Sequence, residues 1–272
     1  MSNDVHFGTE VSSIFIISSN ELKRVVFDPL SIIVFVFLVL LVFLEGEGLR
    51  YTGFSSGASG LIASLNYGLY PMGQYFAAVA VFLGAMSLSE ERSHHSLSIL
   101  LTKPLYRRDI LLGKFLGLSI FLLSFIFAVY FAYSLVLFIL VGTPISLTDF
   151  TLRCVTLALV MFLESSLAMS MAILAGVVFK KGLQAAVVGV TFFFMVWYSS
   201  LLTNLGSLNS LSPFMLLFQI IMGNGDSYQL LDSATSYSIW FNAAFPFLVF
   251  IVLEIFVMLA VDCLVFVRRE EV

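Results

Sequence analysis

Two acidic residues, Glu164 and Glu254, lie near the middle of two long apolar segments of this sequence. An ionised carboxylate at the centre of a bilayer is costly unless it is paired or hydrated. No lysine or arginine lies within four positions of either residue, so a partner must come from another helix or from water. The pair can line a polar translocation path or bind a cationic cargo. It can equally consist of protonated groups inside a helix bundle, and the sequence leaves both roles open.

A second concentration of polar residues reads LSEERSHHSLSILLTKPLYRRDILLGK and occupies positions 88–114. Its leucines at 97, 100 and 101 follow helical spacing, and Lys103-Pro104 ends the pattern. The loop 89–109 is therefore expected to hold a short amphipathic helix. Its apolar stripe suits a groove on a partner protein, and a solvated loop is the alternative.

Three other motifs are not expected to form catalytic or metal sites. Ser59 lies in a G-x-S-G tetrad, but every histidine is predicted on the opposite side of the membrane, beyond reach of that serine. Asp226 lies in a G-x-G-D tetrad, but the Tyr-Asp pair of intramembrane aspartyl proteases occurs nowhere in the chain. His94 and His95 point about 100° apart on a helix and converge poorly on one ion. We predict no catalytic residue and no metal site.

The elements that carry these residues are set by composition. Of the 272 residues, 60% are hydrophobic and only 11% are charged, and the mean hydropathy is +1.05. Soluble domains carry about 25% charged residues, so a soluble enzyme is excluded. The apolar segments are long enough for helices of about 20 residues. We expect a single all-α transmembrane domain over residues 1–272, with six spans at about 27–44, 69–88, 110–141, 151–178, 183–203 and 243–266.

The distribution of basic residues predicts the topology. With six spans, eleven of the 13 Lys and Arg residues fall on one side, and only Arg50 and Arg153 fall on the other. Positive charge favours the cytoplasmic side. The chain is therefore expected in the plasma membrane as a multi-pass protein with both termini cytoplasmic.

Three shorter features complete the predicted architecture. Residues 9–26 have apolar residues at helical spacing on one face and polar residues on the other, which predicts an amphipathic helix in the cytoplasmic interface. Residues 211–223 are apolar but too short to span, which predicts a re-entrant helix on the outer side before the last span. Gly113 and Gly117 form a G-x-x-x-G motif that permits close helix approach.

The chain resembles the ABC type-2 permeases, which are six-span membrane subunits of ATP-binding-cassette transporters. The resemblance covers the order of elements. In size, the chain is similar to small permeases such as that of nitrous-oxide-reductase maturation. It rests on the Asn20–Arg24 stretch, on Leu211-Ser212-Pro213-Phe214 followed by Gly223, and above all on Glu91, leucines 97–101, Pro104, Arg107, Gly113 and Lys114.

The resemblance implies that the 89–109 helix is a coupling helix on a separate ATPase subunit. The residues then expected to couple are Glu90, Glu91, Leu97, Leu100, Leu101, Pro104, Arg107 and Lys114. The N-terminal helix would make a second contact through Glu21, Lys23 and Arg24. The chain has no G-x-x-x-x-G-K-[ST] motif, so we expect no enzyme activity and no cofactor in it, with ATP and Mg on the partner.

The expected complex is therefore an exporter built from two permease chains, most simply a homodimer, and two ATPase subunits in the lipid bilayer. One alternative is an ion-coupled carrier that uses Glu164 and Glu254 as proton sites. Another is a mechanotransmitting scaffold for an extracytoplasmic partner. No nucleic-acid partner is expected, and the sequence does not identify the cargo.

Overall fold

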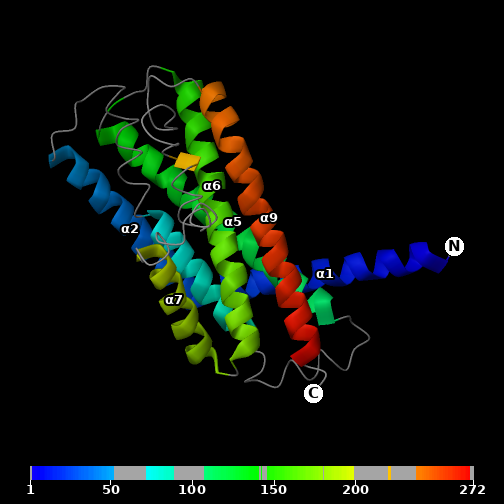
Figure 1. Cartoon of the computed structure of the whole chain (residues 1–272). Helices are drawn as coiled ribbons and strands as arrows, with labels where there is room; N and C mark the ends of the chain where they lie inside the picture. Colours follow the sequence, from blue (N-terminus) through cyan, green and yellow to red (C-terminus); the bar gives the residue numbers. More distant parts are fainter. Residues whose placement is uncertain are drawn as a thin grey trace.

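The computed structural model describes residues 2–51, 72–88, 107–140, 142, 146–179, 181–198, 220–221 and 237–269. Within these ranges all regular structure is helical. The helices are α1 (Ser2–Val26), α2 (Pro29–Tyr51), a helix over Met72–Leu88 that we call helix 72–88, α5 (Arg107–Leu140), α6 (Leu147–Val178), α7 (Gly182–Tyr198) and α9 (Tyr237–Arg269). Figure 1 shows most of them running side by side, with α1 projecting from one end of the bundle.

Three of these helices, α5, α6 and α9, are long and apolar enough to cross a membrane on their own. The α1–α2 pair counts as a fourth candidate span. Helix 72–88 is apolar and 17 residues long, and Gly182–Phe193 is the apolar part of α7. The described residues thus establish an all-helical protein with three or four candidate spans, and the expectation of six spans stays a prediction.

The junction between α1 and α2 lies where the sequence predicts a turn. α1 ends at Val26, α2 begins at Pro29, and the two axes differ in direction by 63°. The Asp28 carboxylate accepts a hydrogen bond from the backbone N–H of Leu30 at 3.3 Å, which satisfies one donor of the new helix. α1 begins at Ser2 rather than at the predicted residue 9. Its bend away from α2 suits a helix that lies along a membrane surface.

The opposite end of the bundle is organised at the start of α6. Ser146 caps the helix by accepting from the Asp149 N–H at 3.3 Å. Asp149 in turn accepts from Arg153 Nε at 2.9 Å, one helical turn further on. The Arg153 side chain is 2% exposed, so the N-terminal end of α6 holds its cation inside the protein.

Small residues bring helix 72–88 and α6 into close contact. A Cβ added at Gly84 would lie 2.7 Å from the carbonyl oxygen of Met169, and one at Gly176 would lie 2.9 Å from that of Ala85. Buried alanines surround this contact, among them Ala77, Ala168 and Ala172. In a bilayer, helices associate through such van der Waals packing. Lipid tails are as apolar as the helix side chains, so the hydrophobic effect does not drive the helices together.

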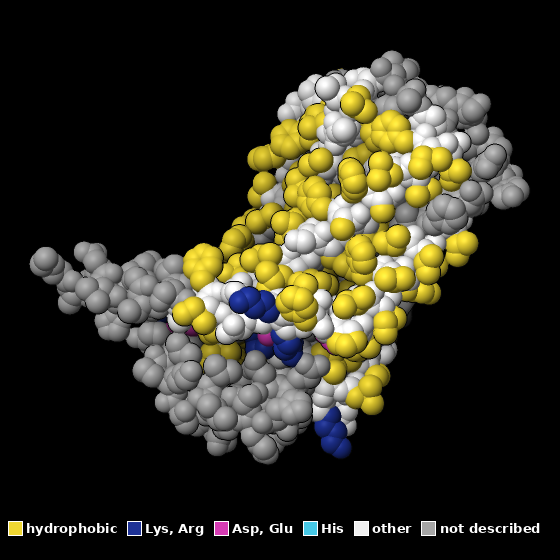
Figure 2. Space-filling view, turned by 180° about the vertical axis from the view of Figure 1, so that it is seen from behind, with side chains coloured by type: hydrophobic (Ala, Val, Ile, Leu, Met, Phe, Trp, Pro, Cys, Tyr) yellow, Lys and Arg dark blue, Asp and Glu magenta, His cyan; other side chains and the backbone are white. Residues whose placement is uncertain are grey.

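The helix ends that the sequence places on the cytoplasmic side gather at one end of the bundle (Figure 1). Arg269 at the end of α9 donates to the Val177 carbonyl at the end of α6, at 3.0 Å. Figure 2 shows hydrophobic side chains over most of the visible face, while the Lys and Arg side chains in this view gather toward its lower part. A basic end below an apolar body is the arrangement that the basic-residue pattern predicts. Which side of the membrane that end faces stays a prediction.

Near the start of α9, Trp240 is 1% exposed, and its Nε1–H donates to the Ile220 carbonyl at 2.7 Å. Ile220 and Ile221 are helical and buried, and they are the only described residues of the predicted re-entrant segment 211–223. The indole therefore ties this segment to the last long helix.

We expect Trp240→Phe to lower the free energy of unfolding by about 1 to 2 kcal/mol, because the buried Ile220 carbonyl loses its donor. Thermal unfolding of the purified chain in detergent measures the change. Phe241→Leu is the matched control, since Phe241 is 40% exposed, and it should shift stability by less than about 0.5 kcal/mol. Equal shifts in both variants would show that the hydrogen bond does not anchor the segment.

Candidate functional site

A buried lysine joins three helices at the end of the bundle from which α1 projects. Lys114 of α5 is 1% exposed. Its Nζ donates to Glu21 Oε2 of α1 at 3.0 Å and to the Ser87 carbonyl of helix 72–88 at 3.0 Å. We call Glu21, Ser87 and Lys114 the three-helix junction.

Electrostatics stabilise this junction in spite of its burial. The Glu21 side chain is 5% exposed and also accepts from Arg24 at 2.6 Å, and the Arg24 side chain is 38% exposed. Glu21 thus lies between a buried cation and a half-exposed one. A buried ion pair is stable only when its remaining hydrogen-bonding groups are also satisfied. For Lys114, the Ser87 carbonyl accepts one of these further hydrogen bonds.

Two glycines allow α1 to lie against α5 at this point. A Cβ added at Gly117 would lie 2.6 Å from the Ser18 backbone oxygen and 2.9 Å from Glu21 Cβ. One added at Gly113 would lie 2.8 Å from Ile17 Cβ. The G-x-x-x-G motif therefore provides close helix approach within one chain, between α1 and α5.

The face that α1 turns toward α5 combines a small polar residue with apolar ones. Ser18 and Val25 are each 3% exposed, and Ser18 lies at the glycine contact. Phe15 and Ile16, by contrast, are 64% and 61% exposed. A small polar residue is favoured at the contact because the backbones approach there, and the large apolar residues remain available to lipid.

The three-helix junction lies at both ends of the predicted coupling loop. Ser87 precedes Leu88, the last described residue before the loop, and Lys114 lies two turns into α5 after it. Of the predicted coupling residues, Glu90, Glu91, Leu97, Leu100, Leu101 and Pro104 lie outside the described residues, and of Arg107 the structure describes the backbone alone.

Among the predicted residues that are described, Glu21, Arg24 and Lys114 are brought together, and Lys23 is not part of the group. Lys114 and Glu21 are buried and hold the chain's own helices, while Lys23 is exposed on α1. Lys23 and the half-exposed Arg24 are the two that remain accessible to a partner.

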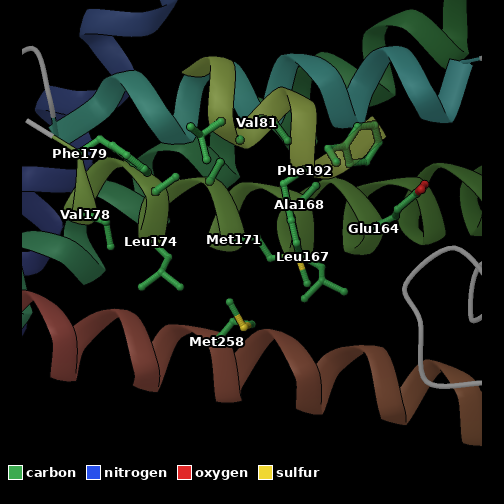
Figure 3. Close-up of a pocket in the computed structure, with 15 residues that line it drawn as sticks. Val81, Glu164, Leu167, Ala168, Met171, Leu174, Val178, Phe179, Phe192 and Met258 are labelled. Carbon is green, nitrogen blue, oxygen red and sulfur yellow. The ribbon is translucent and has the colours of Figure 1, made fainter. Parts of the chain in front are cut away.

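The predicted intramembrane carboxylates do not meet each other in a hydrogen bond. Glu164 of α6 is 2% exposed, and neither of its oxygens has a hydrogen-bond partner. Glu254 of α9 is half-buried, with Oε2 unpartnered. Glu164 lines a cavity of about 400 Å³ between helix 72–88, α6, α7 and α9 (Figure 3). In the described part of the chain, no group of three or more His, Cys, Asp or Glu residues is arranged to hold a metal ion.

Sequence reasoning missed several members of these groups. Ser87 contributes a backbone carbonyl, and such a contribution cannot be predicted from residue type. Tyr130 lies in electrostatic range of Glu164 from a different helix. Asp262 of α9 is fully buried, and both of its carboxylate oxygens lack a hydrogen-bond partner. A carboxylate within a predicted span is the signal that could have added Asp262.

The sequence model of the ABC-2 family transporter proteins matches residues 15–270. No curated protein matches the chain. The matched range includes α5, α6, α7, α9 and the three-helix junction.

Proposed function

The chain belongs to the ABC-2 family of transporter proteins, and we propose that it is the permease subunit of an ATP-driven exporter. In this proposal two copies of the chain form the translocation path, and two separate ATPase subunits drive it. The loop 89–109 is the coupling helix, and the exposed surface of α1 adds a smaller contact through Lys23 and Arg24.

The observation that supports the proposal is the three-helix junction at the ends of this loop. A displacement of the loop acts on helix 72–88 and on α5, because residues 89–106 connect them directly. Lys114 joins both helices to α1. Movement imposed at the loop is therefore delivered to three helices as a unit, which is what a coupling element requires.

Close packing carries this movement further into the membrane domain. Helix 72–88 contacts α6 backbone to backbone at Gly84 and Gly176, so it cannot shift without moving α6. α6 in turn contributes Glu164 and most of the cavity lining. The proposed path thus includes Glu164, with Glu254 on the facing helix α9.

The source of energy lies outside this chain. The whole sequence lacks the G-x-x-x-x-G-K-[ST] motif whose backbone cradles nucleotide phosphates. ATP and Mg would therefore bind to the partner ATPase, and the permease itself would catalyse no reaction.

Purification from the native membrane in mild detergent tests this function. We expect a soluble chain with a phosphate-binding loop to co-elute in stoichiometric amount and to be lost from the double variant Leu97→Asp/Leu101→Asp. Leu105→Asp is the control, because it replaces a leucine of the same loop by aspartate outside the predicted stripe, and it should retain the partner.

Two results would contradict the proposal. One is recovery of the wild-type chain alone, together with proton-dependent transport in vesicles, which would favour the carrier based on Glu164 and Glu254. The other is retention of the ATPase by the double variant, which would exclude the leucine stripe as the docking surface.

A further inference from the structure

The Glu164 carboxyl lies in the contact between α6 and helix 72–88. A Cβ added at Gly73 would lie 3.3 Å from Glu164 Oε2 and 2.7 Å from the sulfur of Met161. Figure 3 shows the carboxyl pointing away from Met258 of α9. The cavity is therefore lined by the apolar part of this side chain, and the carboxyl itself belongs to the contact between the two helices.

The surroundings of this carboxyl do not support a charge. Both of its oxygens are buried, and neither has a hydrogen-bond partner. Tyr130 of α5 lies in electrostatic range, and its hydroxyl is also unpartnered. The titratable side chain of helix 72–88 is Tyr75, which is 36% exposed, and α7 and α9 contribute Phe192 and Met258 beside Glu164. An isolated ionised carboxylate is not stable in such surroundings, so Glu164 is neutral while this contact is closed.

The two ends of helix 72–88 contact α6 in different ways. Near the coupling loop, a Cβ at Gly84 would meet the Met169 carbonyl oxygen at 2.7 Å, and one at Gly176 would meet that of Ala85 at 2.9 Å. At Gly73 the nearest atoms all belong to side chains. Backbone atoms cannot turn aside, whereas side chains can. Helix 72–88 is therefore fixed to α6 near the loop and is free to separate from it at Gly73.

We propose that Glu164 is a protonation-controlled latch for the Gly73 end of helix 72–88. While the helix lies against α6, the carboxyl keeps its proton. When this end separates, water enters the contact, the carboxyl O–H bond breaks, and the proton passes to water. Closing takes one proton up again. The latch rests on the proposed function in taking the Gly73 end as a gate of the translocation path.

The direction of the pH effect follows from this proton balance. The closed arrangement holds one more proton than the open arrangement, so low pH favours closing and high pH favours opening. Linkage to a single proton limits the change in the ratio of open to closed molecules to about tenfold per pH unit. A purely structural role for Glu164 predicts no such dependence, because packing alone does not respond to protons.

Distances between spin labels at the Gly73 end test the proposal. They are measured by pulsed electron paramagnetic resonance on the purified chain in lipid nanodiscs, without ATP or an ATPase subunit. The labels are attached at Tyr75→Cys and Leu159→Cys, two exposed positions, after Cys154→Ser and Cys263→Ser have removed the native thiols. We expect a second, longer distance whose population rises as the pH is raised from about 5 to about 9. Replacing Tyr75 also removes it as a source of this dependence.

A second pair of labels reports on the end near the coupling loop. Phe82→Cys and Val178→Cys are exposed positions close in sequence to the backbone contacts at Gly84 and Gly176. Their distance should stay the same over the whole pH range, because that end does not separate.

Variants identify the carboxyl that controls the opening. Glu164→Gln keeps the size of the side chain but cannot ionise, so it should stay closed and lower the open-to-closed ratio at least tenfold at the highest pH. Glu254→Gln removes the other mid-span carboxyl and should retain the wild-type pH dependence. Gly73→Ala should raise the open fraction at every pH, because its Cβ would lie 2.7 Å from the Met161 sulfur.

Three results would overturn the proposal: a pH-independent distance at the Gly73 end, an unchanged pH dependence in Glu164→Gln, or its loss in Glu254→Gln. Should Glu164→Gln fail to fold, Gly73→Ala decides, since an unchanged open fraction there would show that this contact does not control opening. Because the distances are measured on the permease alone, a negative result leaves the association with an ATPase untouched. Failure of an ATPase to co-elute would likewise leave the latch untouched.

Discussion

Replacing Gly117 by alanine is expected to lower the free energy of unfolding by about 3 kcal/mol, near the upper end of what overpacking costs. The new Cβ would lie 2.6 Å from the Ser18 backbone oxygen and 2.9 Å from Glu21 Cβ. A backbone oxygen cannot turn aside as a side chain can, so α1 must move away from α5. That movement also lengthens the contact between Glu21 and Lys114. Thermal unfolding of the purified chain, with protease cleavage of α1 as a second measurement, checks the prediction.

Gly189→Ala is the matched control for this substitution. A Cβ at Gly189 would meet the Cγ1 atom of Val81 at 3.1 Å, and a valine side chain can give way. Alanine also favours a helix over glycine by about 1 kcal/mol, so Gly189→Ala should be neutral or slightly stabilising. If Gly117→Ala were equally neutral, the close approach of α1 to α5 would not be a determinant of the fold.

Replacing Lys114 by methionine is expected to cost about 3 kcal/mol of stability, the lower end of the range for breaking a buried ion pair. The substitution removes the cation that contacts Glu21 Oε2 at 3.0 Å and the Ser87 carbonyl at 3.0 Å. Glu21 retains Arg24 at 2.6 Å, which is why the lower end applies. With the junction broken, ATP hydrolysis by the partner should continue while transport falls.

A double-mutant cycle tests the assignment of this energy. The variant Lys114→Met/Glu21→Gln should be more stable than the sum of the single changes predicts, by about 1 to 3 kcal/mol, since the residues contact each other. Lys23→Met is the control, because Lys23 is exposed on the same helix as Glu21, and it should change stability by less than about 0.5 kcal/mol. Strict additivity of the two changes would refute a direct interaction.

Both variants act on one arrangement, in which α1 is held against α5 and helix 72–88 at the base of the proposed coupling loop. The glycines determine how near α1 can come, and the lysine determines which residue of α1 lies at the contact. Loss of either should therefore impair coupling more than it impairs insertion into the membrane.

The sequence by itself was sufficient for the class of protein and for the positions of most helices. Long apolar segments and a low charge content report directly on lipid exposure, because each residue's transfer cost is local. The structure accordingly has α5 over Arg107–Leu140 where a span at 110–141 is predicted, and α9 over Tyr237–Arg269 where one at 243–266 is predicted. The resemblance to ABC type-2 permeases, carried by short motifs, is confirmed by the family match.

What only the tertiary structure decided is which residues meet. Lys114 and Glu21 are 93 positions apart, and neither residue's surroundings in the sequence indicate that the two form a buried pair. From the sequence alone, Gly117 could equally have formed a contact between two chains. A small residue permits close approach of a second helix but does not determine which helix that is. Glu164 was recognisable as a costly charge in an apolar helix. That it lines a cavity beside α7 and α9 depends on how four helices pack, and such packing is a property of the whole bundle rather than of any one segment.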